Sequence, residues 1–381
     1  MRIIVSGAIG RSYVGGQAWV YMQYLAGLRD LGHDVYYLED CGEESWVYHW
    51  EEQQLTTDLD YPAAYVRDCL SLIGFGDRWI YRAGSESRGM PVEQFEQLCS
   101  GADLLLVRAV PLTVWRKEYH LPRRRAFIDV DPGFTQISLL NGDPALTSNV
   151  DRCERLFTYG QGIGRPDCLI PAAGRDWLKT VPPVALDYWP VAEESEGAAT
   201  HFTTVIRWRG FRDAEYNGVN YGQRDREFPH YIDLPRLTRQ PFRVAALGAD
   251  LESLAEHGWD AVSGEVESMT PRQYQRFIQG SRAEFGVAKH LYVEMRTRWF
   301  SDRSVCYLAS GRPVLAQSTG IEDLLPVGEG IVTFRSLQEA ISGVDHINSD
   351  YERHRRAARQ IAETCFAARH VLSDLLSGAI N

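Results

Sequence analysis

The sequence predicts an α/β protein of two domains, each built on a largely parallel sheet. Apolar runs of strand length alternate with helical patterns along the chain, and strands that alternate with helices pair in parallel sheets. The chain has 381 residues, of which 44% are hydrophobic. At about 150 residues per domain, that length favours two cores over one.

The first domain is predicted to cover residues 1–188. Its opening strand ends in glycine and is followed by a glycine loop at Gly15 and Gly16, then by a helix that ends near Leu31. In this helix apolar residues recur every three or four positions, as one buried face requires. The expected strands of this domain lie at residues 2–7, 35–38, 103–108 and 126–131.

Residues 189–200 are predicted to link the domains, because they are rich in acidic and small residues and poor in apolar ones. A second alternating series then covers 201–360. Its expected strands lie at 202–208, 242–248, 259–262, 284–288, 313–316 and 331–334, and its expected helices at 270–281, 302–310 and 336–344. The segment 350–380 reads as helical throughout.

Net charge and cysteine spacing limit the classes of partner and site that the sequence allows. The net charge of −11 argues against a nucleic-acid partner. The seven cysteines contain no C-x-x-C pair, so neither a zinc site nor a disulfide framework has the required spacing. The first apolar run is too short for a signal peptide, and no segment approaches 18 uninterrupted apolar residues. We therefore expect a cytoplasmic protein without a membrane span.

The segment 299–320 places hydroxyl and charged residues at the start of a predicted helix. Ser301 is the expected N-cap, and Asp302, Arg303 and Ser304 form the first turn. Backbone N–H groups and the positive end of the helix dipole favour an anion there, and the hydroxyl and guanidinium donors suit phosphate oxygens. We predict a diphosphate at this helix; a simple cap with a solvated Arg303 is the alternative.

This arrangement resembles the nucleotide-sugar half of GT-B-fold glycosyltransferases. The family pattern is close to E-G-F-G, several residues, then E-A-M-A-x-G-x-P-V-V-A. Aligning that pattern on 309-ASGRPVLA-316 places Phe300 on the motif phenylalanine and residues 301–304 at the donor diphosphate. The resemblance therefore implies that the second domain binds a nucleoside-diphosphate sugar.

Two positions depart from the family pattern. The motif glutamates fall on Arg298 and Cys306. Because the second glutamate usually contacts the ribose, we expect Asp302 or another carboxylate to take that role in a divergent branch.

The resemblance extends to the first domain, where 15–38 is similar to the family's Gly-Gly loop, first helix and second strand. Together with 126–134, 156–164 and 299–314, it resembles a bacterial group of glycosyltransferases. The resemblance implies two Rossmann-like domains that face a cleft, with the helix at 361–381 packing back on the first domain. It also implies sugar transfer to a small-molecule or glycan acceptor bound by the first domain. The glycines of the loop would let the backbone approach a phosphate or sugar closely.

Basic residues follow two predicted strands of the second domain. Arg207 and Arg209 follow its first strand, and Lys289 and His290 follow 284–288. Ligands of open α/β sheets collect at such strand ends. Cations there would neutralise a departing nucleoside diphosphate in place of a metal ion. The alternative is that each cation pairs with a nearby acid.

The candidates for acceptor activation are Asp129 and Asp131, at the end of the strand at 126–131. A carboxylate that faces the cleft accepts a hydroxyl proton if burial brings its pKa towards neutrality. Asp131, which precedes Pro132, is alternatively a turn-forming residue. The sequence does not decide between inversion and retention of the anomeric configuration.

Other functions stay open at this point. A dinucleotide-dependent oxidoreductase is disfavoured, because the loop from Gly7 to Gly16 does not follow G-x-G-x-x-G. A nucleotide-sugar epimerase of the same fold and a non-catalytic nucleotide- or sugar-binding protein are the remaining alternatives. We expect no cofactor and no metal beyond the nucleotide-sugar co-substrate. The oligomeric state is open, with a homodimer among the alternatives.

Overall fold

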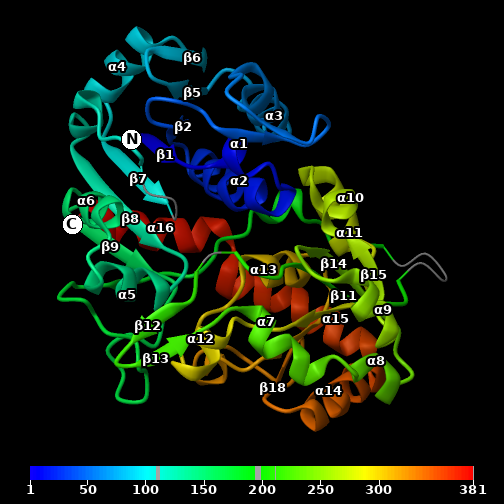
Figure 1. Cartoon of the computed structure of the whole chain (residues 1–381). Coiled ribbons are helices and arrows are strands. Elements are labelled where there is room, and N and C mark those ends of the chain that lie inside the picture. The colour runs from blue at the N-terminus through cyan, green and yellow to red at the C-terminus, as the bar shows by residue number, and fades with distance from the viewer. Residues whose placement is uncertain (109–111, 194–198, 211, 381) are drawn as a thin grey trace.

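The computed structural model describes residues 1–108, 112–193, 199–210 and 212–380. These residues form two α/β lobes, one above the other in Figure 1. The first lobe contains an eight-stranded sheet and the second a six-stranded sheet. The predicted fold class, two α/β units on largely parallel sheets, is confirmed.

The sheet of the first lobe has the strand order β10-β9-β8-β7-β1-β2-β5-β6, and only the β5–β6 pair is antiparallel. Its strands are β1 (Arg2–Ser6), β2 (Asp34–Asp40), β5 (Trp79–Ala83), β6 (Glu86–Gly89), β7 (Leu104–Arg108), β8 (Arg124–Asp129), β9 (Arg155–Thr158) and β10 (Leu178–Lys179). A separate hairpin pairs β3 (Val47–His49) with β4 (Gln54–Thr56). Every residue of β7 is buried, because helices cover both faces of a parallel sheet.

The helices of the first lobe are α1 (Ile9–Ser12), α2 (Gly15–Asp30), α3 (Asp60–Ser71), α4 (Val92–Ser100), α5 (Phe134–Leu140) and α6 (Pro144–Asp151). The helix α2 packs against α16 (Ala368–Ile380), the last helix of the chain. A Cβ at Gly27 of α2 would come within 2.6 Å of Ala368 and Leu372. The two helices therefore approach closely only because position 27 has no side chain.

The sheet of the second lobe is parallel throughout, with the order β15-β14-β11-β16-β17-β18. Its strands are β11 (Phe202–Arg207), β14 (Phe242–Leu247), β15 (Asp260–Ser263), β16 (Ala283–Gly286), β17 (Val314–Gln317) and β18 (Ile331–Phe334). A hairpin of β12 (Ala214–Tyr216) and β13 (Val219–Tyr221) extends towards α5 of the first lobe. All six sheet strands coincide with apolar runs chosen from the sequence.

The helices of the second lobe are α7 (Arg224–Glu227), α8 (Leu234–Leu237), α9 (Leu251–Glu256), α10 (Gly264–Ser268), α11 (Pro271–Gln279), α12 (His290–Glu294), α13 (Asp302–Ala309), α14 (Leu337–Ser349) and α15 (Tyr351–Ile361). Thr270 caps α11, and Gln273 returns the hydrogen bond in a capping box. Ser301 caps α13, because its hydroxyl accepts from the backbone N–H of Arg303 at 3.1 Å. Both starts lie where the sequence predicts them.

The C-terminal segment differs from the prediction of one continuous helix. After α15 the chain forms a π-helical turn over Ala362–Phe366, and Ala367 then has an extended backbone. The strand-like pairing of Val184 stabilises this break: its N–H donates to the carbonyl of Phe366 at 2.7 Å, and its carbonyl accepts from Ala368 N–H at 2.9 Å. The break directs α16, drawn in red in Figure 1, back along the first lobe.

The two lobes are in direct contact at the start of α2. The indole N–H of Trp19 donates to the carbonyl of Pro271 at 2.8 Å, and the hydroxyl of Tyr65 donates to that of Met269 at 2.6 Å. A Cβ at Gly15 would lie 2.2 Å from the carbonyl oxygen of Thr270. One apolar core continues from α2 into α11 and α13. Among the helices of the described residues, none has the length and apolar character needed to span a bilayer.

Candidate functional site

A cavity of about 540 Å³ lies between the two lobes, and we call it the inter-lobe cavity. It opens at the carboxyl ends of β7, β11 and β14 and beyond the end of β8, where open α/β sheets bind their ligands. Its polar and charged lining consists of Ser12, Gln17, Arg108, Asp131, Arg207, Arg224, Ser268, Lys289, Ser301, Asp302 and Arg303. The cavity therefore collects chemistry from both lobes.

Two helices begin at this cavity. The first turn of α2 contributes Gly16 and Gln17 from the first lobe, and no side chain caps this helix. The first turn of α13 contributes Asp302 and Arg303 from the second lobe. Because helix N-termini carry partial positive charge and N–H groups without helical partners, both ends favour an anion in the space between them.

Gly15 and Gly16 have different surroundings, although the sequence assigned both to one ligand-binding loop. Gly16 lines the cavity, whereas Gly15 is pressed against the backbone of Thr270 in the second lobe. Glycine at position 15 is therefore needed for the lobes to approach. The structure brings only the second glycine of the pair to the cavity.

Arg303 is buried rather than solvated. Its Nε donates to Glu284 Oε1 at 2.5 Å, and one terminal nitrogen donates to the carbonyl of Val205 at 2.9 Å. Ser304 is also buried and does not line the cavity. Arg303 thus lines the cavity from a position fixed by these two hydrogen bonds, whereas Ser304 does not reach the cavity.

Asp131 connects the lobes through the cavity. Its Oδ1 accepts from Lys289 Nζ at 2.5 Å and from the hydroxyl of Tyr292 at 2.5 Å. Burial raises the pKa of Asp131, but the Lys289 ammonium, the Tyr292 hydroxyl and the Arg224 charge together outweigh burial, and the resulting pKa lies below the ordinary value. Asp131 is therefore an anion at neutral pH.

Asp129 is not at the cavity. It is 1% exposed, and its carboxylate accepts from the side chains of Thr135, Gln136 and Thr158 and from the N–H of Asp131. Burial is the main cause that raises its pKa. These four hydrogen bonds let Asp129 stabilise the turn that carries Asp131. Asp129 cannot reach an acceptor hydroxyl unless these hydrogen bonds break.

Two other predicted residues lie away from the cavity. Arg209 pairs with Asp213 at 3.0 Å and with Asp225 at 2.8 Å. His290 begins α12, and its Nδ1 accepts from the N–H of Gly222 at 3.2 Å. For Arg209 the structure matches the alternative of pairing with nearby acids, whereas His290 contacts a backbone N–H instead of an acid. Arg207 and Lys289, by contrast, line the cavity as expected.

Comparison with known proteins shows a similarity of fold. A family model described as glycosyl transferase-like matches residues 232–376. A solved α-glucosyltransferase in complex with UDP and a 13-mer DNA containing a central A:G mismatch superposes with a TM-score of 0.62 at 11% identity, covering 100% of both chains. Anabaena HepE in complex with UDP and glucose superposes with a TM-score of 0.57 at 13% identity, covering 99% of each chain. AviGT4, a glycosyltransferase involved in avilamycin A biosynthesis, superposes with a TM-score of 0.54 at 11% identity, covering 99% of this chain and 96% of AviGT4. A search of curated sequences found no match.

The chain has the GT-B fold. The motif departures can now be placed within it. Cys306 is buried one turn into α13, where its thiol contacts the carbonyl of Asp302 at 3.4 Å. Arg298 lies three residues before the α13 cap, and its guanidinium pairs with Asp167 and Asp323. Neither side chain lines the cavity of this GT-B protein.

Sequence reasoning missed two cavity cations. Arg108 ends β7 and is 1% exposed, its guanidinium carbon lies 5.2 Å from the ring centres of Tyr21 and Tyr24, and it donates to Asp302 Oδ1 at 3.1 Å. The sequence feature that could have identified Arg108 is its position as the last residue of a buried strand. Arg224 begins α7, and burial, followed by the neighbouring Arg303, lowers its pKa to about 10. No sequence pattern marks Arg224, because the hairpin and α7 are placed by tertiary contacts.

Proposed function

We propose that this protein transfers a sugar from a nucleoside-diphosphate sugar to an acceptor bound by the first lobe. The proposal rests on one observation: the inter-lobe cavity is positive in a protein of net charge −11. Five cationic side chains and two carboxylates line it, and Glu284 behind Arg303 lowers the excess from three positive charges to two. A linked diphosphate is the ligand that this excess and the two helix N-termini favour.

The diphosphate is proposed to lie between Arg207 and Arg224. Among the described residues, neither side chain has an ion-pair partner, whereas Arg303 pairs with Glu284 and Lys289 with Asp131. Arg224 is desolvated and Arg207 is exposed, and a phosphate at either side chain would meet no competing local carboxylate. Their charge would stabilise the departing nucleoside diphosphate, the role that a metal ion takes where one is bound.

Asp302 would repel a diphosphate if it were unpaired. Arg108 lies against it from the first lobe and offsets its charge, although burial raises the pKa of Asp302 overall. We propose that Asp302 faces the ribose hydroxyls instead of the phosphates. This would give it the contact that the replaced motif glutamate supplies in the family.

Asp131 is the proposed base for the acceptor hydroxyl. While Lys289 holds its carboxylate, the pKa is low and Asp131 is a weak base. A donor diphosphate would draw Lys289 towards itself, and the pKa of Asp131 would then rise. Donor binding would in this way prepare the base, so that the acceptor hydroxyl is activated only when a sugar is present.

We propose a small-molecule or glycan acceptor in a cytoplasmic protein. One solved neighbour was determined in complex with DNA. For this chain, the net charge of −11 disfavours a nucleic-acid acceptor, because binding to phosphate backbones depends on cationic surface.

Donor binding is tested with Arg207→Ala and Arg224→Ala, and Arg209→Ala serves as the matched control two positions away. UDP, TDP and GDP are titrated into each protein by calorimetry, with UDP as the first probe. We expect UDP affinity to fall about tenfold or more in the first two variants, since a charge-assisted contact to phosphate is worth about 1.5–3 kcal/mol. We expect no change in Arg209→Ala. Equal loss in all three variants, or no binding of any nucleotide by the wild type, would contradict the proposal.

The reaction is tested by incubating the donor with and without acceptors. A transferase gives a new glycoside only with an acceptor, whereas an epimerase converts the donor alone. Binding without turnover across many acceptors would indicate a non-catalytic binding protein.

A further inference from the structure

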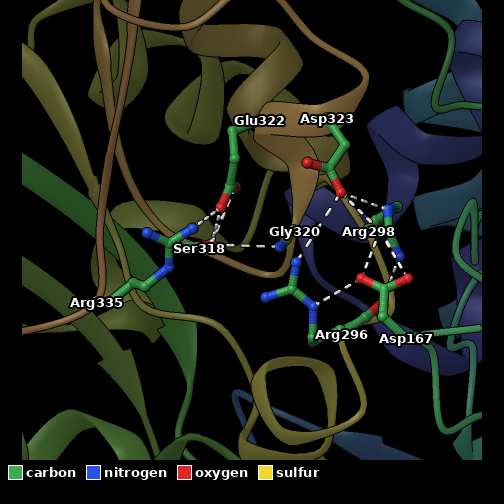
Figure 2. Close-up of polar contacts among 8 residues, drawn as sticks. All are labelled: Asp167, Arg296, Arg298, Ser318, Gly320, Glu322, Asp323 and Arg335. Atoms are coloured by element: carbon green, nitrogen blue, oxygen red, sulfur yellow. Dashed lines mark hydrogen bonds and ion pairs between the residues drawn. The ribbon is translucent and has the colours of Figure 1, made fainter.

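The segment that precedes α13 joins the two lobes through four charged side chains, shown in Figure 2. Arg296 and Arg298 come from this segment, Asp167 from the loop after β9 in the first lobe, and Asp323 from the short 3₁₀ helix η4 (Ile321–Asp323) in the second lobe. We call these four residues the arginine clamp. None of them lines the inter-lobe cavity.

Arg298 is the centre of the clamp. Its side chain is 2% exposed, and its outer nitrogen Nη2 contacts Asp167 Oδ2 at 2.8 Å and Asp323 Oδ2 at 2.6 Å. Its Nε also donates to Asp323 Oδ2 at 3.1 Å. One planar guanidinium therefore bridges a carboxylate from each lobe, a geometry that a lysine ammonium cannot reproduce with the same set of donors.

The backbone of this segment is strained. Arg296 has φ of +47° and Arg298 has φ of +55°, in the left-handed region that side chains other than glycine rarely occupy. Such residues persist only where the surroundings hold them in place, and they gather at functional sites. Arg296 adds to that support, because its Nε donates to Asp167 Oδ2 at 3.0 Å.

The first lobe is fastened to the same segment by main-chain hydrogen bonds. The N–H of Gly162 donates to the carbonyl of Thr297 at 2.9 Å, and that of Leu169 donates to the carbonyl of Met295 at 3.1 Å. A Cβ at Gly162 would lie 2.6 Å from the carbonyl oxygen of Arg296. The loop that carries Gly162, Asp167 and Leu169 thus packs directly against the backbone of the segment before α13.

The turn that carries Asp323 is itself held in place. Ser318 Oγ donates to the carboxylate of Glu322 at 2.9 Å and accepts from the N–H of Gly320 at 3.3 Å, and Arg335 pairs with Glu322 (Figure 2). Asp323 is therefore presented from a fixed turn and not from a mobile loop.

We propose that Arg298 is a positioning residue that clamps the lobes together and fixes the start of α13 at the inter-lobe cavity. The chain runs from Arg298 through Trp299, whose indole N–H donates to the carbonyl of Val130 at 3.1 Å, to the Ser301 cap and Asp302. A shift of Arg298 moves this short connection and, with it, the amides of α13. The consequence for donor binding rests on the proposed function; the clamping of the lobes does not.

Hydrogen–deuterium exchange tests the clamp without any ligand. Asp167→Asn and Arg298→Lys are compared with the wild type, and Asp151→Asn is the control, since Asp151 is a half-exposed aspartate of the first lobe that also pairs with an arginine. We expect the amides of Gly162 and Leu169 to exchange about fivefold faster in the two clamp variants and at the wild-type rate in the control. Unchanged exchange in both clamp variants would overturn the clamp.

Calorimetry with UDP tests the positioning role. We expect Kd to rise about fivefold in Asp167→Asn and Arg298→Lys while the stoichiometry stays near one, because a merely structural defect would lower the stoichiometry and leave Kd unchanged. Faster exchange with an unchanged Kd would overturn positioning. Faster exchange in a protein whose wild type binds no nucleotide would leave the clamp standing and remove the proposed function instead.

Discussion

Gly15→Ala sets two effects on stability against each other: the higher helix propensity of alanine and a clash of its Cβ with the second lobe. Gly15 is the first residue of α2, and its φ is not in the positive range, so alanine fits the helical backbone. Alanine is favoured over glycine by about 1 kcal/mol in a helix interior, and this is an upper bound for the first residue of α2. The new Cβ, however, would lie 2.2 Å from the carbonyl oxygen of Thr270 and 2.4 Å from its carbonyl carbon. Both are backbone atoms, so no side-chain rotation relieves the clash.

The size of the disturbance follows from these distances. Ordinary contact to a Cβ begins at 3.4 Å, so the lobes must separate locally by about 1.2 Å. The neighbouring hydrogen bonds from Trp19 and Tyr65, now 2.8 and 2.6 Å, would then lengthen beyond hydrogen-bonding distance. Losing two such bonds costs about 1–3 kcal/mol, which exceeds the helix gain. A misplacement of about 1 Å at a reaction centre costs about a hundredfold in rate.

The assay compares turnover with stability. We expect kcat/KM of Gly15→Ala to fall about ten- to a hundredfold, while the thermal midpoint falls by only a few degrees. Gly76→Ala is the control, because the nearest atom to its added Cβ is 3.9 Å away. Full activity in Gly15→Ala at an unchanged midpoint would refute the view that this contact sets the spacing of the lobes.

Two further predictions concern titrating groups. Lys289→Met removes the ammonium that contributes most to lowering the pKa of Asp131, so this pKa should rise and the acid limb of the pH–rate profile should move to higher pH. Because the native pKa of Asp131 is depressed, its contribution to the free energy of unfolding is present above the unfolded pKa of about 3.8 and is lost as the pH falls from there through the lower native pKa. Urea titrations should therefore show a weaker acid dependence in the variant, and identical curves would count against the ion pair. Burial lowers the pKa of Lys179 to about 8, so part of this amine is uncharged and nucleophilic at pH 8. We expect an amine-reactive reagent to modify Lys179 faster than the exposed Lys117 at this pH, as measured by mass spectrometry. A faster reaction at Lys117 would contradict this prediction.

Local patterns predicted most of the fold. The strands β7, β11, β14 and β18 coincide with apolar runs within a residue or two, because strands buried on both faces need continuous hydrophobic stretches. The starts of α11 and α13 were predictable from their capping residues. The break at Ala367 was not, since it depends on hydrogen bonds to Val184, a residue far away in the sequence.

The candidate site was predicted only in part. Ser301, Asp302 and Arg303 lie at the cavity because a cap and a first turn are local features. Asp129 and Asp131 occupy the same strand end and look equivalent in sequence, yet one is enclosed by four donors and the other faces the cleft. Which of two neighbouring carboxylates is accessible depends on the chains packed around them.

The sequence by itself determined the strands of the two largely parallel sheets and the caps of α11 and α13, because each depends on residues close together in the chain. Only the tertiary structure decided which cations have acid partners, that Gly15 serves lobe contact, and that Arg298 bridges Asp167 and Asp323. These contacts join residues from 25 to more than 200 positions apart in the chain, and local patterns carry no information about which distant segments meet.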